Sequence, residues 1–240
     1  MLEQNELYKN IKNEISNYEI KPTEAIVSGE YIIPGLNGKK VNIKDSYYNM
    51  KEFGDFNSLY LMYDVIYPSN SLENNKDKII KEGNKGKNSV SFILEYDKNI
   101  IDFFINNGID ASVLVDINTF SKDNKLEQIN NDINNFNNLE ALLNKYTNNS
   151  NICFVNKENE SLCKENKKYL VTTEKIVNNN TIINIKNNIS SGNIYKVEKN
   201  TDISDIKIII NSILYKDLDI VRLSKLISEE ISWTITSFLV

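Results

Sequence analysis

The 240-residue sequence contains no histidine and a single arginine, Arg222. Histidine is the usual general base near neutral pH, the commonest metal ligand, and the partner that activates serine and cysteine nucleophiles. An enzyme built from this chain would have to work without any of these contributions. Arginine is the side chain best suited to bind phosphate through paired hydrogen bonds, so that chemistry is scarce as well. These absences argue against a histidine-dependent hydrolase and against nucleic-acid recognition.

Cysteine is nearly as rare, because the chain has only Cys153 and Cys163. A chain of this length can bury a full core without a disulfide, so we expect one core thiol and one surface thiol rather than a bond closing a short loop. No second pair of ligands accompanies the two cysteines, and soft metals need such clusters. We therefore expect no bound zinc or other transition metal, and no cofactor.

Charge and hydropathy add two further exclusions. The formal net charge is −5 with both signs interspersed, so no basic surface is available for nucleic acid. No stretch approaches the roughly 20 apolar residues of a transmembrane helix, and the opening MLEQNELYKNIKNEI has no apolar signal core. The protein is then either cytoplasmic, or exported and anchored through a segment that this sequence lacks.

Strand-like and helix-like segments alternate after residue 88. Short apolar runs, typical of buried strands, lie at 89–95, 111–117, 151–155, 168–172, 181–185 and 193–197. Amphipathic stretches, typical of helices, lie at 99–107, 126–146 and 202–214. This alternation predicts parallel βαβ units, and six strands favour a barrel or a long doubly wound sheet.

Residues 1–87 follow a different pattern. Residues 3–19 predict a helix with Leu7, Ile11 and Ile15 on one face, and the polar residues 69–88 indicate a surface connector. Between them the sequence is dense in aromatic residues, which either bind sugars or anchor this region to its neighbour. Packing is the simpler interpretation, since aromatic side chains dominate core burial. The residues are Tyr47, Tyr48, Phe53, Phe56, Tyr60, Tyr63 and Tyr67.

Four segments stand in an informative order: VSFILEYD at 90–97, GIDASVLVD at 108–116, GNIYKVE at 192–198 and LDIVRLSKL at 218–226. Together they resemble the polysaccharide deacetylase (NodB-homology) family. Its domain opens with a strand ending in two aspartates and closes with Gly-x-Ile-x-Leu-x-His and a Leu-Ser-x-Leu segment. The resemblance implies a distorted parallel (β/α) barrel at 88–240, with residues 1–87 as a mixed α/β extension packed on it. IIPGLNGKKVN at 32–42 is similar to a segment preceding this domain in some clostridial-type proteins.

The family's catalytic residues do not carry over. Active members hold a metal through one aspartate and two histidines, and a neighbouring aspartate acts as the base. Those aspartates fall on Glu95 and Tyr96, and the late catalytic histidine falls on Glu198. Residues 119–138, where the histidine pair belongs, contain no histidine, and FVNK at 154–157 replaces an arginine-proline motif. The resemblance therefore implies relic positions and no intact catalytic or metal site.

Carboxylates are nevertheless expected where the active sites of such barrels cluster, at the carboxyl ends of strands. Beside Glu95 and Glu198, the candidates for binding are Asp97 and Asp116. Oxygen ligands alone could hold magnesium or calcium, although ordinary solvated carboxylates are the simpler interpretation. Tyr96 is bulkier than the aspartate it replaces. We expect its ring to cover the metal position and its hydroxyl to donate a hydrogen bond to Glu198.

We therefore expect a catalytically silent protein of the cell envelope of a low-GC Gram-positive bacterium. It would bind cell-wall glycan in the inherited groove or scaffold another envelope protein, outside the cytoplasm or anchored to the membrane. The activity of the family is carbohydrate N-deacetylation, the hydrolysis of a non-peptide C–N bond. Two alternatives stay open. One is an active peptidoglycan-type deacetylase with a rebuilt carboxylate site, and the other is an unrelated cytoplasmic α/β interaction domain.

Overall fold

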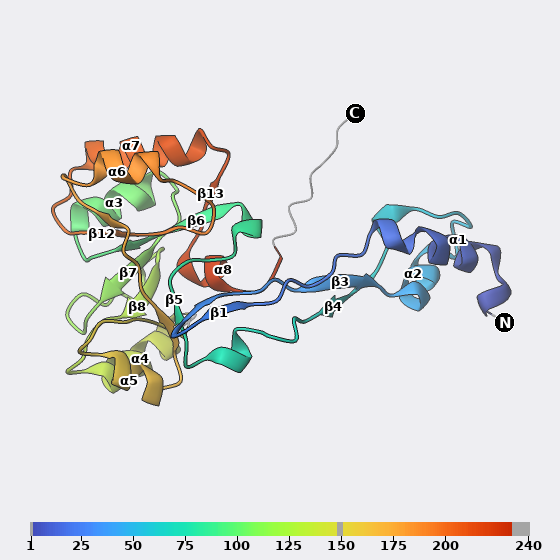
Figure 1. Cartoon of the computed structure of the whole chain (residues 1–240), viewed down its shortest axis with the longest axis horizontal. Coiled ribbons are helices and arrows are strands. Elements are labelled where there is room, and N and C mark those ends of the chain that lie inside the picture. The colour runs from blue at the N-terminus through green and yellow to red at the C-terminus, as the bar shows by residue number, and fades with distance from the viewer. Residues whose placement is uncertain (1, 148–150, 232–240) are drawn as a thin grey trace. The chain divides into compact units, whose positions relative to one another are not determined.

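The computed structural model describes residues 2–147 and 151–231, and within them the chain forms two compact units (Figure 1). The larger unit comprises Ile26–Pro34 and Leu72–Ser228. The smaller comprises the described parts of 1–25, 35–71 and 229–240. The boundary expected at residue 87 therefore needs correction, because 26–34 and 72–87 supply strands to the larger unit. That the N-terminal region packs on the barrel stays a prediction.

A parallel sheet in the order β11–β12–β6–β7–β8 forms one part of the barrel, and β13 pairs with the first residues of β6. Every residue of β6 is buried. Val90, Phe92 and Leu94 belong to the core under the helices, so Ser89, Ser91 and Ile93 face the barrel interior. The strands are β6 (Ser89–Leu94), β7 (Ser112–Val115), β8 (Glu127–Asn130), β11 (Ile176–Val177), β12 (Ile194–Val197) and β13 (Asp219–Ile220).

A second sheet, in the order β1–β2–β5–β10–β9, is parallel except for the β1–β2 hairpin. Its edge strand β9 lies against β8 of the first sheet. Among the described residues no backbone ladder joins these two strands. We call this unpaired junction of β8 and β9 the seam. The strands are β1 (Ile26–Ser28), β2 (Tyr31–Ile33), β5 (Ile79–Ile80), β9 (Ile152–Phe154) and β10 (Tyr169–Val171).

Helices cover the outside of the first sheet. Figure 1 shows α3, α6 and α7 together, and their isoleucines and phenylalanines share one core with β6, β7 and β12. No helix in the described part of the chain is long and apolar enough to cross a membrane. The helices of the larger unit are α3 (Lys98–Asn106), α4 (Phe136–Tyr146), α5 (Glu160–Glu165), α6 (Ile182–Asn187), α7 (Ile203–Leu214) and α8 (Leu223–Ile227), with short 3-10 turns η4 (Glu73–Asn75) and η5 (Lys85–Lys87).

The smaller unit packs two helices on a two-stranded antiparallel sheet. Leu7 and Ile11 are buried and Ile15 packs beside them, which confirms the predicted apolar face. Its elements are α1 (Glu6–Glu14), β3 (Gly38–Val41), α2 (Ile43–Met50) and β4 (Tyr63–Ile66), with 3-10 turns η1 (Leu2–Gln4), η2 (Ile15–Asn17) and η3 (Ser58–Tyr60).

Three predictions of local structure are wrong. The expected surface connector at 69–88 contains β5, whose two isoleucines lie buried between β2 and β10. The stretch at 126–146, expected to be helical, begins with β8 before α4 starts. The strand expected at 181–185 is part of α6, because Ile182 and Ile185 are spaced to face one side of a helix. Strands of two to four residues are too short to show a period of two.

Gly192, the first residue of the GNIYKVE segment, is required by close backbone packing. Its φ is +87°, and a Cβ added there would lie 2.4 Å from the carbonyl oxygen of Gly83. The amide of Gly83 donates to the Gly192 carbonyl at 2.8 Å, so neither of these two loop segments can move away without losing this bond. Gly108 has a similar φ of +63°, yet nothing lies within 4 Å of its added Cβ.

We therefore expect Gly192→Ala to destabilise the protein more than Gly108→Ala. Backbone strain should cost each variant about 1–2 kcal/mol of unfolding free energy. The steric conflict should add roughly 1–3 kcal/mol for Gly192→Ala alone. Denaturant unfolding of both variants measures the difference, and equal losses would contradict this account of Gly192.

Candidate functional site

The candidate carboxylates Glu95, Asp116 and Glu198 directly follow the ends of their strands, at the carboxyl edge of the first sheet. Leu94 of β6 and Val197 of β12 are register partners, so Glu95 and Glu198 follow at the same level. Asp116 follows β7, the neighbour of β6 on its other side. The sequence therefore placed these residues correctly along the strands. Their partners decide whether they can act together.

Glu95 forms an ion pair with Lys196 of β12. Its Oε1 lies 2.6 Å from the Lys196 Nζ, and its Oε2 accepts from the Lys199 backbone amide at 3.2 Å. Both side chains are on the interior side of the barrel, since Leu94, Tyr195 and Val197 face the helices. The Lys196 ammonium also lies 5.7 Å from the ring centre of Phe154.

This pairing sets the charge state of Glu95. Burial by itself would raise the pKa of the carboxyl. The hydrogen bonds from Lys196 and Lys199, together with their positive charges, outweigh burial and leave the pKa below its ordinary value. At neutral pH Glu95 is thus an ionised carboxylate whose charge is neutralised by a protein ammonium group.

Asp97 caps α3 and so has a structural task. Its Oδ1 accepts from the backbone amides of Asn99 and Ile100 at 2.9 and 3.4 Å. Its Oδ2 accepts from the amide of Asn200 at 3.0 Å, and this bond is the main cause that lowers the pKa of Asp97. The side chain therefore joins the start of α3 to the loop after β12.

Asp116 and Glu198 are likewise engaged by neighbouring loops. Asp116 Oδ1 accepts from the backbone amides of Asn118 and Thr119, both at 2.9 Å, in a turn after β7. Glu198 Oε2 accepts from the Asn178 amide nitrogen at 3.0 Å. Neither side chain joins Glu95 in a shared cluster.

The hydrogen bond expected between Tyr96 and Glu198 is wrong. Within residues 2–147 and 151–231, Asn178 is the side-chain partner of Glu198, and Tyr96 makes no hydrogen bond through its hydroxyl. The Tyr96 side chain is 44% exposed. Lys196 and Phe154, rather than Tyr96, lie on the interior side beside Glu95.

Two groups at this edge were not expected from the sequence. Lys196 looked like an ordinary residue of a strand, since only pairing of β12 with β6 brings it beside Glu95. Asp132 was not recognised as a residue at the end of a strand, because the stretch containing β8 was expected to be helical. It is buried and accepts from the amides of Ile117 and Asn135 at 3.0 and 2.9 Å. Burial raises its pKa, but these hydrogen bonds outweigh it and leave the pKa low.

The residues present do not fit the metal that the resemblance implies. Tyr96 stands at one of the two aspartate positions, and no histidine exists to complete the set. In the described part of the chain, no group of three or more Asp, Glu or Cys side chains is arranged to hold a metal ion. The carboxylates at the strand ends instead bind ammonium and amide groups of the protein.

An open cavity of about 280 Å³ lies elsewhere on the larger unit. It is lined by the β1–β2 hairpin, by the residues after β5 and by the loop after β10. Lys81 forms an ion pair with Glu174 at 3.0 Å beside it and lies 3.7 Å from the ring centre of Tyr31. None of the relic positions lines this cavity.

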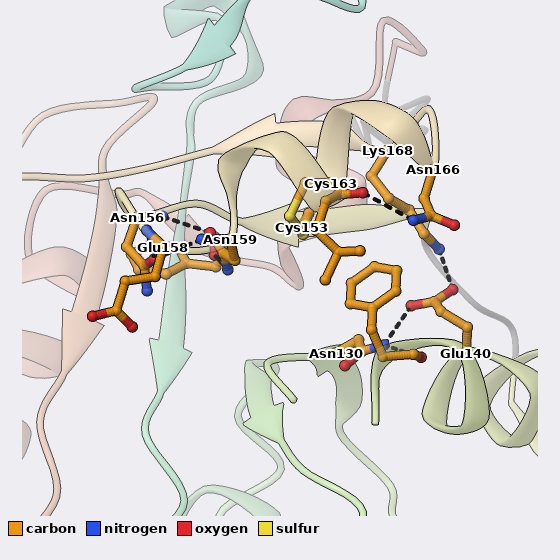
Figure 2. The surroundings of a disulfide bond; sticks show 12 residues. Asn130, Glu140, Cys153, Asn156, Glu158, Asn159, Cys163, Asn166 and Lys168 are labelled. Atoms are coloured by element: carbon orange, nitrogen blue, oxygen red, sulfur yellow. Dashed lines mark hydrogen bonds and ion pairs between the residues drawn. A yellow bond between two sulfur atoms is a disulfide. The ribbon is translucent and has the colours of Figure 1, made fainter. Parts of the chain in front are cut away.

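The two cysteines form a disulfide, so the expectation of two free thiols is wrong. Cys153 of β9 and Cys163 of α5 are both buried, with their Cα atoms 6.0 Å apart (Figure 2). The ten-residue separation suggested only a short loop, whereas that loop folds as a strand followed by a helix that packs back on it.

Comparison with known proteins shows the fold. No family model matches the chain. A segment of 89 residues is 38% identical to the uncharacterized protein YlxY of Bacillus subtilis, and the match spans 37% of this chain and 28% of that relative. BA3943 of Bacillus anthracis, a CE4 family pseudoenzyme, aligns with a TM-score of 0.64 at 16% identity, over 94% of this chain and 96% of its own.

A second solved structure extends this likeness to an enzyme. The Bc1960 peptidoglycan N-acetylglucosamine deacetylase aligns with a TM-score of 0.51 at 13% identity, over 63% of this chain and 94% of its own. The chain thus has the deacetylase-type α/β barrel fold, which confirms the predicted fold class.

Replacing Glu95 tests the ion pair. We expect Glu95→Gln to lower the unfolding free energy by about 1–2 kcal/mol at neutral pH, because it leaves Lys196 without its partner. Because the pKa of Glu95 is lower in the folded state, its contribution is present above the ordinary glutamate pKa. It is lost as the pH falls through the folded-state pKa. The stability difference between wild type and variant should therefore shrink in acid.

Glu158→Gln is the matched control, since Glu158 is exposed and its carboxylate has no ion-pair partner among the described residues. Denaturant unfolding at several pH values makes the comparison. Parallel pH profiles for wild type and Glu95→Gln would contradict the assigned pairing.

Proposed function

We propose that this chain, a polysaccharide-deacetylase-like protein, is a non-catalytic component of the cell envelope that binds wall glycan. One observation is the main support for the proposed absence of catalysis. At the carboxyl edge of the barrel, the Glu95 carboxylate is neutralised by the Lys196 ammonium, 2.6 Å away. The ammonium group of the protein thus contacts the carboxylate of Glu95, which occupies a position where the family has an aspartate.

The chemistry of deacetylation explains why this matters. Amide hydrolysis needs an activated water and a group that stabilises negative charge on the carbonyl oxygen. Glu95 is engaged by Lys196, Glu198 by Asn178, and Asp97 by the start of α3. A rebuilt carboxylate site would have to break these bonds, so the active-enzyme alternative is the weaker one.

The comparisons support the same proposal. BA3943, which shares the fold over most of both chains, is described as a CE4 family pseudoenzyme, and one of its mutants has restored enzymatic activity. The fold is therefore known in a protein without native activity. A silent site in the present chain would be a second such case.

The disulfide supports a location outside the cytoplasm. Disulfides persist in oxidising compartments and are rare where cellular thiols keep cysteines reduced. The bond between Cys153 and Cys163 thus favours an exported protein over the cytoplasmic alternative. This placement, in the envelope of a low-GC Gram-positive bacterium, agrees with a role at the wall.

Exposed aromatic side chains of the smaller unit are the best surface for a glycan. Tyr47, Phe56 and Tyr63 pack against the core of the smaller unit itself, and the expected packing of this region on the barrel stays a prediction. Phe53 is 62% exposed, and Tyr60 is stacked on it with ring centres 4.9 Å apart. Stacked exposed rings offer the apolar face on which a sugar ring can rest, whereas the barrel edge is occupied by the Glu95 pair. A scaffold for another envelope protein is the second candidate, since exposed aromatics also anchor protein interfaces.

We expect no acetate release from acetylated chitooligosaccharides by the purified protein, either as isolated or after loading with zinc, cobalt or nickel. The reason is the missing ligand set, and elemental analysis of the same samples should find no stoichiometric metal. Bc1960 serves as the positive control. Acetate release proportional to protein concentration, and lost in Glu198→Gln, would overturn the non-catalytic assignment.

We also expect the protein to sediment with purified cell-wall sacculi. Replacing Phe53 and Tyr60 with serine should weaken this binding by about tenfold, equivalent to about 1.4 kcal/mol. The control is Tyr215→Ser, which removes a tyrosine that is 91% exposed on the larger unit. If wild-type protein stays in the supernatant, glycan binding fails and the scaffold candidate remains.

A further inference from the structure

Three polar side chains form a buried network at the seam between the two sheets. Asn130 ends β8, Glu140 lies on α4, and Lys168 immediately precedes β10 (Figure 2). Asn130 is 2% exposed, and the side chains of Lys168 and Glu140 are 7% and 12% exposed. Groups of this polarity are seldom buried unless they are paired.

One carboxylate connects the other two groups. Glu140 Oε1 accepts from the amide nitrogen of Asn130 at 3.0 Å, and Glu140 Oε2 contacts the Lys168 ammonium. Asn130 is held further by a bond from its amide nitrogen to the Phe136 carbonyl, and by its oxygen, which accepts from the Asp132 amide. A buried amine and a buried carboxamide are thus fixed on the two oxygens of a single carboxylate.

We infer that Lys168 and Asn130 become joined by an intramolecular isopeptide bond, with Glu140 as the proton carrier. In this reaction the Lys168 Nζ attacks Cγ of Asn130. The new Nζ–Cγ bond forms, the Cγ–Nδ2 bond breaks, and one ammonia leaves. The atoms balance without an oxidant, a reductant or a co-reactant.

The position of Glu140 suits both proton transfers. The Lys168 ammonium must lose one proton to become a nucleophilic amine and a second as the new bond forms, while the departing nitrogen gains one to leave as ammonia, which takes up the other. Glu140 Oε2 contacts the first nitrogen and Glu140 Oε1 the second, so one carboxyl group can take the proton and deliver it. Burial excludes the water that would otherwise compete as nucleophile. The reaction requires the Lys168 Nζ to move from Glu140 Oε2 to Cγ of Asn130, which is held on the other oxygen of the same carboxylate.

The bond would strengthen the barrel where backbone pairing is missing. β8 and β9 are neighbours without a ladder, and Lys168 leads into β10 on the far side of β9. A link from Asn130 to Lys168 would close this seam covalently. The Cys153–Cys163 disulfide lies in the same core as Phe136, so two cross-links would reinforce one region.

Mass spectrometry of the full-length, reduced protein tests the inference. The expected mass is that of the sequence less one ammonia. Cyclisation of an asparagine to a succinimide also releases ammonia, so a tryptic map must accompany the intact mass. The expected product is a branched peptide that joins residues 126–145 to residues 168–175, with Lys168 resistant to trypsin and fragment ions locating the link at Asn130.

Two variants make the test specific. Glu140→Gln keeps the size of the side chain but cannot carry the proton, and Lys168→Arg keeps the positive charge without a nucleophilic amine. Both should show the full sequence mass and unlinked peptides. A wild-type protein with full mass and separate peptides, in fresh and in aged samples, would overturn the isopeptide bond. A linked Glu140→Gln variant would overturn the role of Glu140.

Discussion

The larger unit depends on β6, a strand that is buried on both faces and paired along both edges. It pairs with β12 on one side and with β13 and β7 on the other. Phe92 and its helix-facing neighbours pack under α3, α6 and α7, whereas Ser89 and Ser91 fit the narrow interior. A parallel strand that is covered on both faces has little room for charged side chains, or for large side chains that face a narrow interior. The register that β6 sets also brings Glu95 and Glu198 to the same edge.

At that edge, local stability and catalysis would compete for the same side chains. A metal or a reacting group needs carboxylates that are free to converge on one point. Here each candidate is held by its own loop, through a helix cap at Asp97, a turn at Asp116 and an amide bond at Glu198. The Lys196 ammonium neutralises Glu95, as a bound metal ion would do in an active site. This arrangement keeps the fold intact, because each of these partly buried carboxylates retains a partner.

The seam shows how the barrel tolerates an incomplete sheet. Where β8 and β9 lack a ladder, side chains replace backbone hydrogen bonds, and the network of Asn130, Glu140 and Lys168 spans the gap. The disulfide fixes α5 on β9 beside it. A buried ion pair is stable only when the remaining hydrogen-bonding groups of its members also have partners. Asn130 provides one such partner, because its amide nitrogen donates to Glu140 Oε1. Side-chain chemistry at one junction therefore serves the architecture of the whole unit.

The sequence by itself determined the alternating α/β pattern, most barrel strands after residue 88, and the carboxylates at their ends. Long apolar runs such as 89–95 carry these signals locally. Only the tertiary structure added Ile79–Ile80 and the β1–β2 hairpin to the barrel, because strands so short are defined by their partners and not by a period. It also decided the disulfide and the pairing of Lys196 with Glu95. Lys196 and Glu95 lie far apart in the sequence and meet only because β12 pairs with β6. Cys163 reaches Cys153 only because α5 packs back on β9. No local pattern of residues encodes either contact.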